Sequence, residues 1–220
     1  MKKGICYIVA AGEWYEDDLC LEEEDYLIAT DGGYDTLKKI GKTPDIVIGD
    51  FDSIKVSPED ENCIRLNPIK DETDLLYSVQ YAIEKGYEKI KIYGGTGGNR
   101  VSHTLANVQT LYHYKEVWCF LYDKTEVMFV LHNGKITFSK EAVGYFSVLS
   151  LSQESSGVEE KGLKYEISDV MLTSSYPLGV SNEFLGTESS VSVKDGTLLL
   201  IMNKDQLQHI LSWERYCAKE

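Results

Sequence analysis

The chain has 220 residues, enough for one large domain or two smaller ones that each bury a core of their own. Its 36 acidic residues outnumber its 22 basic ones, and the formal charge of -14 argues against a nucleic-acid-binding surface, which needs clustered basic side chains. All apolar runs fall short of the roughly 18 residues that a membrane-spanning helix needs. Five scattered cysteines without a C-x-x-C pair favour a reducing cytoplasm over a disulfide framework or a zinc site.

Short apolar runs alternate with helical patterns in the first half of the chain. Strands are predicted at residues 5–10, 26–30, 45–48, 89–93 and 117–122. Between Thr73 and Lys85 the apolar residues recur at helical spacing, and Gly86 closes the pattern, so a helix is predicted there. A second helix is predicted to carry Leu105, Val108 and Leu111. This alternation predicts an open, mostly parallel sheet with helices on both faces.

Two carboxylates, Asp50 and Asp52, follow the third predicted strand at positions i and i+2. On an extended backbone they share one face, while Phe51 turns away. Adjacent carboxylates repel each other, and a hard divalent cation is the usual relief, because Mg²⁺ takes one or two carboxylates together with phosphate oxygens. The pattern favours metal-assisted phosphate chemistry. A solvated aspartate-rich turn is the alternative.

Further polar segments follow neighbouring strands. Asp31 comes directly after strand 26–30, and the glycine loop 94–98 follows strand 89–93. Ligands of open parallel sheets bind outside the carboxyl ends of the strands, so these segments are expected to converge there. The segment from Lys70 to Asp74 begins the predicted helix. Its acidic residues could equally serve the helix alone, with Asp71 as the N-cap.

The glycine loop offers backbone amides, followed by Arg100 and the start of a helix, a combination that binds anions. It is neither a Walker A loop, since no Gly-Lys-Ser/Thr follows, nor a G-x-G-x-x-G fingerprint. Ser102 is predicted to cap the helix. His103 could transfer protons or bind phosphate, or it could be a structural histidine.

After residue 124 the pattern becomes all-β, which predicts a domain boundary there. Asn133-Gly134 predicts a hairpin between strands at 127–131 and 135–138. Further strands are predicted at 145–151, 169–174, 189–193 and 197–202, the last two joined by a turn at 194–196. Residues 205–216 are predicted to form a short closing helix. The segment with Ser181 and Asn182 resembles an ordinary connecting loop when judged from its residue types alone.

In order and spacing these motifs resemble those of the thiamine pyrophosphokinase family. The resemblance rests on Asp31-Gly32-Gly33, the run 44–53, Lys70-Asp71-x-Thr73-Asp74, the loop 95–103 and Ser181-Asn182-Glu183-Phe184. It implies an α/β nucleotide-binding catalytic domain at 1–124 and a thiamine-binding β-sandwich at 125–220. It also implies transfer of pyrophosphate from ATP to the hydroxyl of thiamine with Mg²⁺, by a homodimer that binds thiamine where its subunits meet.

Carried over position by position, the resemblance assigns the site residues. Metal and triphosphate would be held by Asp31, Asp50, Asp52 and Asp74. Catalysis would rest on Asp50, Asp52, Asp74 and Arg100. Substrate contacts would come from Asp31, Gly32, Lys70, Asp71, Thr73, Gly97, Gly98, Ser102 and His103, with Ser181 and Asn182 contacting thiamine. The family loop Gly-Gly-Arg-x-Asp-His differs here, because Asn99 replaces a glycine and Ser102 an acid. Two rival functions stay open, a non-catalytic thiamine or nucleotide sensor and a metal-dependent phosphohydrolase.

Overall fold

The computed structural model describes residues 4–15, 19–51, 62–69, 71–98 and 100–216, in two compact units, Met1–Lys124 and Thr125–Glu220. The first unit is α/β and the second is all-β. No helix within these described ranges is long and apolar enough to cross a membrane.

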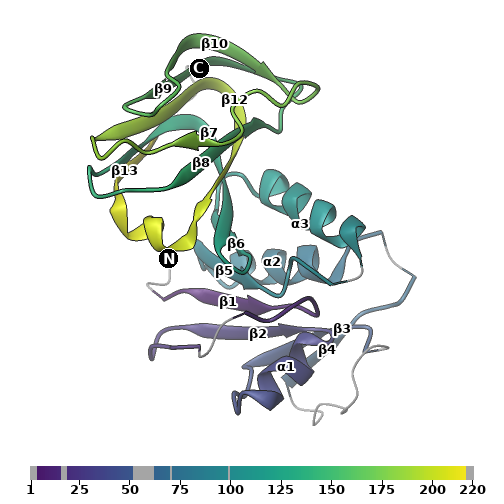
Figure 1. The fold of residues 1–220 in the computed structure, drawn as a ribbon. Coiled ribbons are helices and arrows are strands. Elements are labelled where there is room, and N and C mark those ends of the chain that lie inside the picture. The colour runs from purple at the N-terminus through teal and green to yellow at the C-terminus, as the bar shows by residue number, and fades with distance from the viewer. Residues whose placement is uncertain (1–3, 16–18, 52–61, 70, 99, 217–220) are drawn as a thin grey trace. The chain divides into compact units, whose positions relative to one another are not determined.

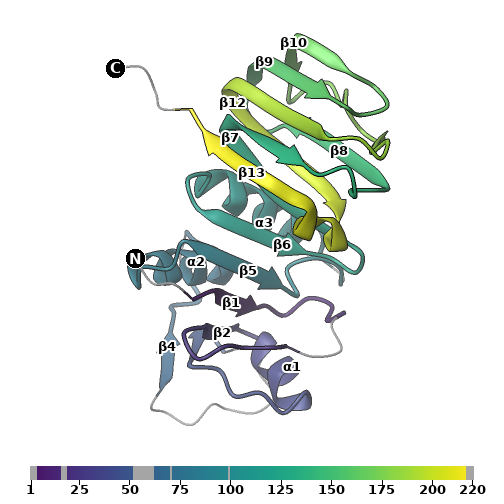
Figure 2. The ribbon, with the colours of Figure 1, turned by 90° about the vertical axis from the view of Figure 1, so that its left-hand side faces the viewer.

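The first unit is built on a parallel sheet (Figure 1). Its strands are β1 (Cys6–Val9), β2 (Tyr26–Thr30), β3 (Ile46–Gly49), β4 (Cys63–Arg65), β5 (Lys89–Tyr93) and β6 (Trp118–Tyr122). They lie in the order β6-β5-β1-β2-β3-β4, and all neighbours are parallel; Figure 2 shows β2, β1, β5 and β6 side by side. The predicted parallel sheet is confirmed. The sequence did not predict β4, since three residues are too few for a periodic signal.

Helices cover both faces of this sheet. They are α1 (Gly33–Lys39), α2 (Asp74–Glu84) and α3 (Val101–His113). Tyr34 and Leu37 of α1 pack in one core cluster with Ala29 of β2. The next strand residue, Thr30, points to the other face, where its hydroxyl lies 2.8 Å from Ser78 Oγ of α2. The two predicted helices are confirmed, and α1 is an addition.

Both predicted N-caps of these helices are wrong. Thr73 caps α2 in place of Asp71, because its backbone is extended and its hydroxyl accepts a hydrogen bond from Leu76 N at 3.2 Å. Arg100 occupies the cap position of α3, without a side-chain cap. Ser102 therefore lies inside the first turn of α3.

The second unit is antiparallel throughout. Its strands are β7 (Glu126–Phe138), β8 (Tyr145–Ser150), β9 (Glu154–Lys161), β10 (Ile167–Thr173), β11 (Asn182–Glu183), β12 (Ser189–Asn203) and β13 (Ile210–Arg215). β12 pairs with β7 along its length, with β9 in its first part and with β8 in its last part. The layer that contains β9 and the layer that contains β8 enclose a core. Phe138, Phe146 and Phe184 fill it, with ring centroids 5.2 to 5.4 Å apart. This arrangement is a β-sandwich in which β7 and β12 belong to both layers.

The hairpin predicted at Asn133-Gly134 and the turn predicted at 194–196 are wrong, because β7 and β12 each continue through these residues. The turn residues lie opposite each other, and Gly196 N donates to Asn133 Oδ1 at 2.9 Å. Asn133 has a positive φ of 41°, Gly196 one of 126°, and the pairing register shifts between Val193 and Thr197. The turn signals therefore mark the bend at which two long strands pass from one layer to the other.

The predicted closing helix at 205–216 is also wrong. Lys204–His209 forms a short 3₁₀ helix, and β13 follows it and pairs with β7. The strand β9 was not predicted, because its run Glu154–Lys161 is rich in serine and glutamate. The strands predicted at 145–151 and 169–174 are confirmed as β8 and β10.

Candidate functional site

A cavity of about 450 Å³ lies at the carboxyl ends of the parallel strands. β2, β3 and β4 lie on one side of β1, and β5 and β6 lie on the other, so the strand order reverses at β1. Open α/β sheets bind their ligands at such a point. The cavity is lined by the loops after β1, β2, β3 and β5 and by the first turns of α2 and α3. From the predicted site it includes Asp31, Asp50, Thr73, Asp74, Gly97, Gly98, Arg100 and His103.

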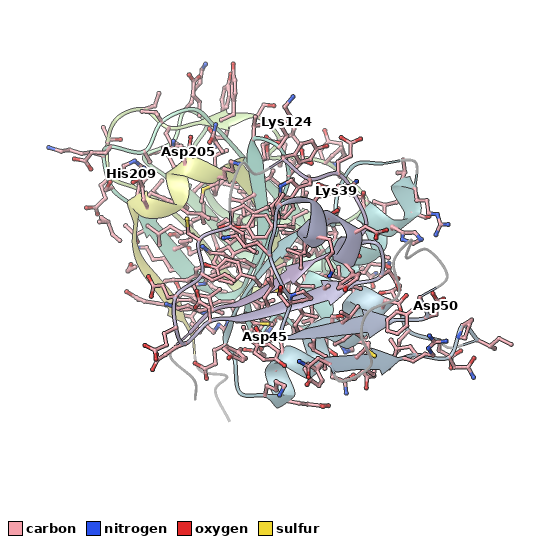
Figure 3. All side chains as sticks on the ribbon, turned by 90° about the horizontal axis from the view of Figure 1, so that it is seen from below. Lys39, Asp45, Asp50, Lys124, Asp205 and His209 are labelled. Carbon is pink, nitrogen blue, oxygen red and sulfur yellow. The ribbon has the colours of Figure 1, made fainter. Side chains whose placement is uncertain are left out.

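Asp50 directly follows β3, and Figure 3 shows it at the opposite end of that strand from Asp45. Asp31 reaches the same edge from β2, with a left-handed backbone at a φ of 48°. Its carboxylate lies where Gly49 has no side chain, since a Cβ built on Gly49 would collide with Asp31 Oδ1. Gly49 thus allows the Asp31 carboxylate to lie across the end of β3.

Asp74 is positioned by a chain of hydroxyl groups. Ser78 Oγ donates to Asp74 O at 2.8 Å, so its single proton is used, and Thr30 Oγ1 must donate to Ser78. Thr30 ends β2, and Asp31 follows it. The first turn of α2 is therefore tied to the strand end that carries Asp31.

The glycine loop after β5 is joined to the loop after β1. Gly12 N donates to Gly94 O at 2.7 Å, and a Cβ on Gly12 would lie 2.4 Å from the same oxygen. Two buried side chains fix the loop from behind: Asn107 Nδ2 donates to Gly95 O at 2.6 Å and Thr96 Oγ1 donates to an oxygen of Asp123 at 2.6 Å. The next residues, Gly97 and Gly98, have positive φ values of 70° and 71° and are exposed.

A carboxylate that the sequence did not predict contacts this loop. Glu13 Oε1 accepts a hydrogen bond from Gly98 N at 3.3 Å, and its Oε2 accepts one from the Tyr15 hydroxyl at 2.6 Å. Both bonds, the tyrosine bond first, lower the pKa of Glu13. The bond to Glu13 is also the main cause that raises the pKa of Tyr15 to about 12. The arrangement shows that the Gly98 N–H can donate to an anionic partner.

Arg100 and His103 lie at the start of α3. Arg100 Nη1 is 3.4 Å from His103 Nε2, and both side chains are exposed at the cavity. Because a guanidinium can only donate, His103 Nε2 is the acceptor, which leaves the proton of a neutral ring on Nδ1. The cavity therefore combines a permanent positive charge with the backbone of the glycine loop and with carboxylates.

Not every predicted site residue can be placed. Asp52, Lys70 and Asn99 lie outside the described residues. Gly32, Asp71 and Ser102 are described but do not line the cavity. Within the described ranges, no three His, Cys, Asp or Glu side chains lie close enough to form a metal cluster on their own.

The two residues predicted to contact thiamine lie in the second unit. Ser181 is exposed, has a positive φ of 60°, and its N–H donates to Ser147 Oγ at 3.0 Å. Asn182, only 2% exposed, begins β11 and pairs with Phe146 of β8. The exposed Ser181 hydroxyl is thus available to a ligand, whereas the Asn182 side chain is held inside the unit.

Comparison with known proteins gives these two units an identity. The family model "Thiamin pyrophosphokinase, catalytic domain" matches residues 18–121, and "Thiamin pyrophosphokinase, vitamin B1 binding domain" matches residues 134–198. Thiamine pyrophosphokinase of Bacillus subtilis is 30% identical over 194 residues, which cover 84% of this chain and 90% of that protein. This chain belongs to the thiamine pyrophosphokinase family. The resemblance read from its motifs is confirmed, and the family is one of enzymes.

Solved structures of thiamine pyrophosphokinases share the fold. The structure from Geobacillus thermodenitrificans has a TM-score of 0.79 at 27% identity and covers 91% of this chain and 98% of that chain. The Bacillus subtilis structure has a TM-score of 0.78 at 28% identity and covers 91% and 99%. Thiamin pyrophosphokinase 1 of Caenorhabditis elegans is 27% identical over 190 residues, or 80% of this chain and 77% of that protein.

Proposed function

We propose that this chain transfers the pyrophosphoryl group of ATP to the hydroxyl of thiamine, giving thiamine diphosphate and AMP. The observation that carries the proposal is the cavity at the sheet edge. There Asp31, Asp50 and Asp74, from three separate segments, face the glycine loop and Arg100 in a chain of this family. Carboxylates, loop amides and a guanidinium are the groups that a magnesium-bound triphosphate needs.

The donor set fits Mg²⁺. This ion binds proteins through one or two carboxylates and takes its other ligands from water and phosphate, so it needs no cluster of three protein side chains. One or two of the four proposed carboxylates, Asp31, Asp50, Asp52 and Asp74, would bind the ion directly. When bound, Mg²⁺ neutralises phosphate charge.

The chain's own groups act by binding and orientation. The hydroxyl oxygen of thiamine forms a bond to the β-phosphorus of ATP and its proton passes to solvent. The bond from that phosphorus to the oxygen bridging to the α-phosphorus breaks, and AMP leaves with that oxygen. Arg100 and the amides of Gly97 and Gly98 would stabilise the negative charge on the phosphate oxygens during this step. We propose further nucleotide contacts by Gly32, Lys70, Asp71, Thr73, Ser102 and His103.

We propose that thiamine binds in 125–220 and the nucleotide in 1–124. Ser181 would contact thiamine, and Asn182, whose side chain is held inside the unit, would take part through its backbone or by holding Ser181. We also propose a homodimer that binds thiamine where its subunits meet. Large apolar side chains surround the Ser181 loop while remaining exposed: Tyr145 68%, Tyr165 61%, Val180 54% and Leu185 56%. Such a surface supports an interface with a second copy.

We further propose that the enzyme works in the cytoplasm. The support is the cysteine pattern, because five scattered cysteines without a C-x-x-C pair suit a reducing compartment.

The deciding experiment is a coupled assay of AMP release, run with ATP and Mg²⁺ in the presence and absence of thiamine. We expect AMP and thiamine diphosphate to form only when thiamine is present. Phosphate release without thiamine would identify a phosphohydrolase, and saturable thiamine binding without any turnover would identify a sensor.

A further inference from the structure

A buried carboxyl group in the second unit has no part in the proposed reaction. Glu160 of β9 is only 1% exposed. Its Oε2 accepts a hydrogen bond from Asn182 Nδ2 at 2.7 Å, and its Oε1 has no hydrogen-bond partner among the described residues. Burying such a group costs free energy, so its retention calls for a reason beyond packing.

The partner of Glu160 has a single possible orientation. Asn182 Oδ1 accepts hydrogen bonds from Tyr165 N and Glu183 N, both at 2.9 Å, and Nδ2 also donates to Tyr165 O at 2.8 Å. Because two backbone N–H groups face one side-chain atom, that atom must be the oxygen. The second proton of Nδ2 then points at Glu160. All four hydrogen-bonding positions of the Asn182 side chain are used inside the protein.

The contact lies directly beneath the loop proposed to bind thiamine. Ser181, the exposed residue before Asn182, has a left-handed backbone, which costs energy unless neighbouring contacts hold it. The other oxygen of Glu160 is aimed at the same loop, since a Cβ on Gly179 would lie 3.6 Å from Oε1. Glu160 thus supports residues 179–182 from below.

We propose that Glu160 is a positioning residue for thiamine binding, whose carboxylate holds the Asn182 side chain and thereby the binding conformation of Ser181. This inference rests on the proposed function and adds to it a residue that never touches the substrate.

The charge of Glu160 is set by its surroundings. Burial raises the pKa of Glu160 to about 7, while the hydrogen bond from Asn182 acts in the opposite direction. Its strand neighbours are the apolar Ile167 of β10 and Val191 of β12. The charged groups of the adjoining segments pair with one another at the surface: Lys161 with Glu159, Lys164 with Glu183, and Lys194 with Asp169. Tyr145, Glu154, Tyr165, Glu166, Tyr176, Glu188 and Asp195 are further titratable groups on these segments.

The ionised form holds Asn182 more strongly than the neutral form, because a carboxylate is the better acceptor. Protonation at low pH should therefore loosen the Ser181 loop and weaken thiamine binding. The chemical step uses groups of the first unit, so kcat should not follow this titration. We therefore expect the KM for thiamine to change with the ionisation of Glu160, and kcat to be independent of it.

The test compares the wild type with Glu160→Gln, whose side-chain oxygen can still accept from Asn182 but cannot ionise. KM for thiamine and kcat are measured at saturating ATP and Mg²⁺ between about pH 6 and about pH 8, one unit on either side of the pKa of about 7. We expect the wild-type KM to fall roughly fivefold across this range and the variant KM to change much less. Titration of thiamine itself affects both proteins equally.

Glu159→Gln is the matched control, because it removes the neighbouring carboxylate on β9, which pairs with Lys161 at the surface. It should keep the wild-type pH profile. Equal pH dependence in Glu160→Gln and the wild type, or a change confined to kcat, would overturn the inference. If Glu160→Gln does not fold, Glu160→Asp decides: its shorter side chain should raise KM at every pH, and an unchanged KM would contradict the proposal. A wild type that releases no AMP with thiamine would instead refute the proposed function.

Discussion

Among single residues, the role of an aspartate depends on the end of the strand at which it lies. β3 carries an aspartate at each end, and the two have different tasks. Asp45 Oδ2 accepts a hydrogen bond from Leu27 N at 2.7 Å, whereas Asp50 lines the cavity with Asp31 and Asp74. The same residue type therefore supports the fold at one end and, in our proposal, the reaction at the other.

This contrast gives a matched pair of variants. Asp50→Asn should lower kcat at least about a hundredfold, since it removes a charge that balances magnesium and phosphate. Asp45→Asn should leave kcat unchanged, because its amide oxygen can still accept from Leu27 N. Thermal unfolding of both variants should stay close to the wild type. Full activity of Asp50→Asn in the AMP-release assay would remove Asp50 from the metal site.

Glu160 also makes a prediction for stability against pH. Its pKa is raised from 4.5 to about 7 on folding. Glu160 therefore contributes up to roughly 3 kcal/mol to the free energy of unfolding. This contribution is fully present below about pH 4.5 and is lost as the pH rises through about 7. The free energy of unfolding, measured with denaturant, should therefore fall more between about pH 5 and about pH 8 in the wild type than in Glu160→Gln. Parallel pH dependence in the two proteins would contradict the raised pKa.

The site residues that directly follow strands could be predicted from the sequence, whereas residues that contact one loop from another could not. Asp31, Asp50 and the glycine loop could be predicted, because parallel strands bring their carboxyl ends to one edge. Glu13 and Asp123 could not, since their contacts depend on how the loop after β1 and the end of β6 meet the glycine loop. No local pattern marks such pairs.

At the scale of elements, α2 is oriented by its polar contacts as well as by its apolar face. Thr30 and Ser78 are both buried, 3% and 0% exposed, and their hydroxyl groups join β2 to the first turn of the helix. A shift of this turn would move Asp74 relative to Asp31.

Ser78→Ala tests this connection. It leaves the buried Thr30 hydroxyl without its acceptor, so we expect a loss of about 1–3 kcal/mol of unfolding free energy and a higher KM for ATP. Gln80→Ala is the control on the same helix, because it removes only an exposed contact with Glu84. A stable Ser78→Ala protein with wild-type kinetics would show that the hydroxyl chain does not position Asp74.

The elements of the two units differed in how well they could be predicted. Buried parallel strands are continuous apolar runs, and α2 and α3 repeat at helical spacing, so local pattern and tertiary structure agree. In the second unit Asn133-Gly134 and Asp195-Gly196 favour turns locally, but each flanking segment finds its partner in a distant strand. Long-range pairing prevailed there over the local preference.

At the scale of the whole molecule, the exposed apolar side chains around Ser181 favour a second copy as their partner. Each chain of 24.9 kDa carries a formal charge of -14, so two copies need an apolar surface to overcome their mutual repulsion. Tyr145 is the most exposed of these side chains, at 68%.

Analytical ultracentrifugation tests the dimer. We expect the wild type to sediment at twice the mass of one chain, and Tyr145→Glu to shift it toward the monomer and raise KM for thiamine. Leu211→Glu is the control, because Leu211 is 58% exposed on β13, outside the Ser181 loop. A monomeric wild type with full activity would refute an interface site.

The Glu13 contact with Gly98 has a consequence for the binding of phosphate groups at the glycine loop. An incoming phosphate that uses the Gly98 amide must first expel the Glu13 carboxylate. The measured affinity is then weaker than the intrinsic one by the fraction of time that the amide stands open. Glu13 would thus act as a built-in competitor that lowers the apparent affinity of every anion using this amide by the same factor.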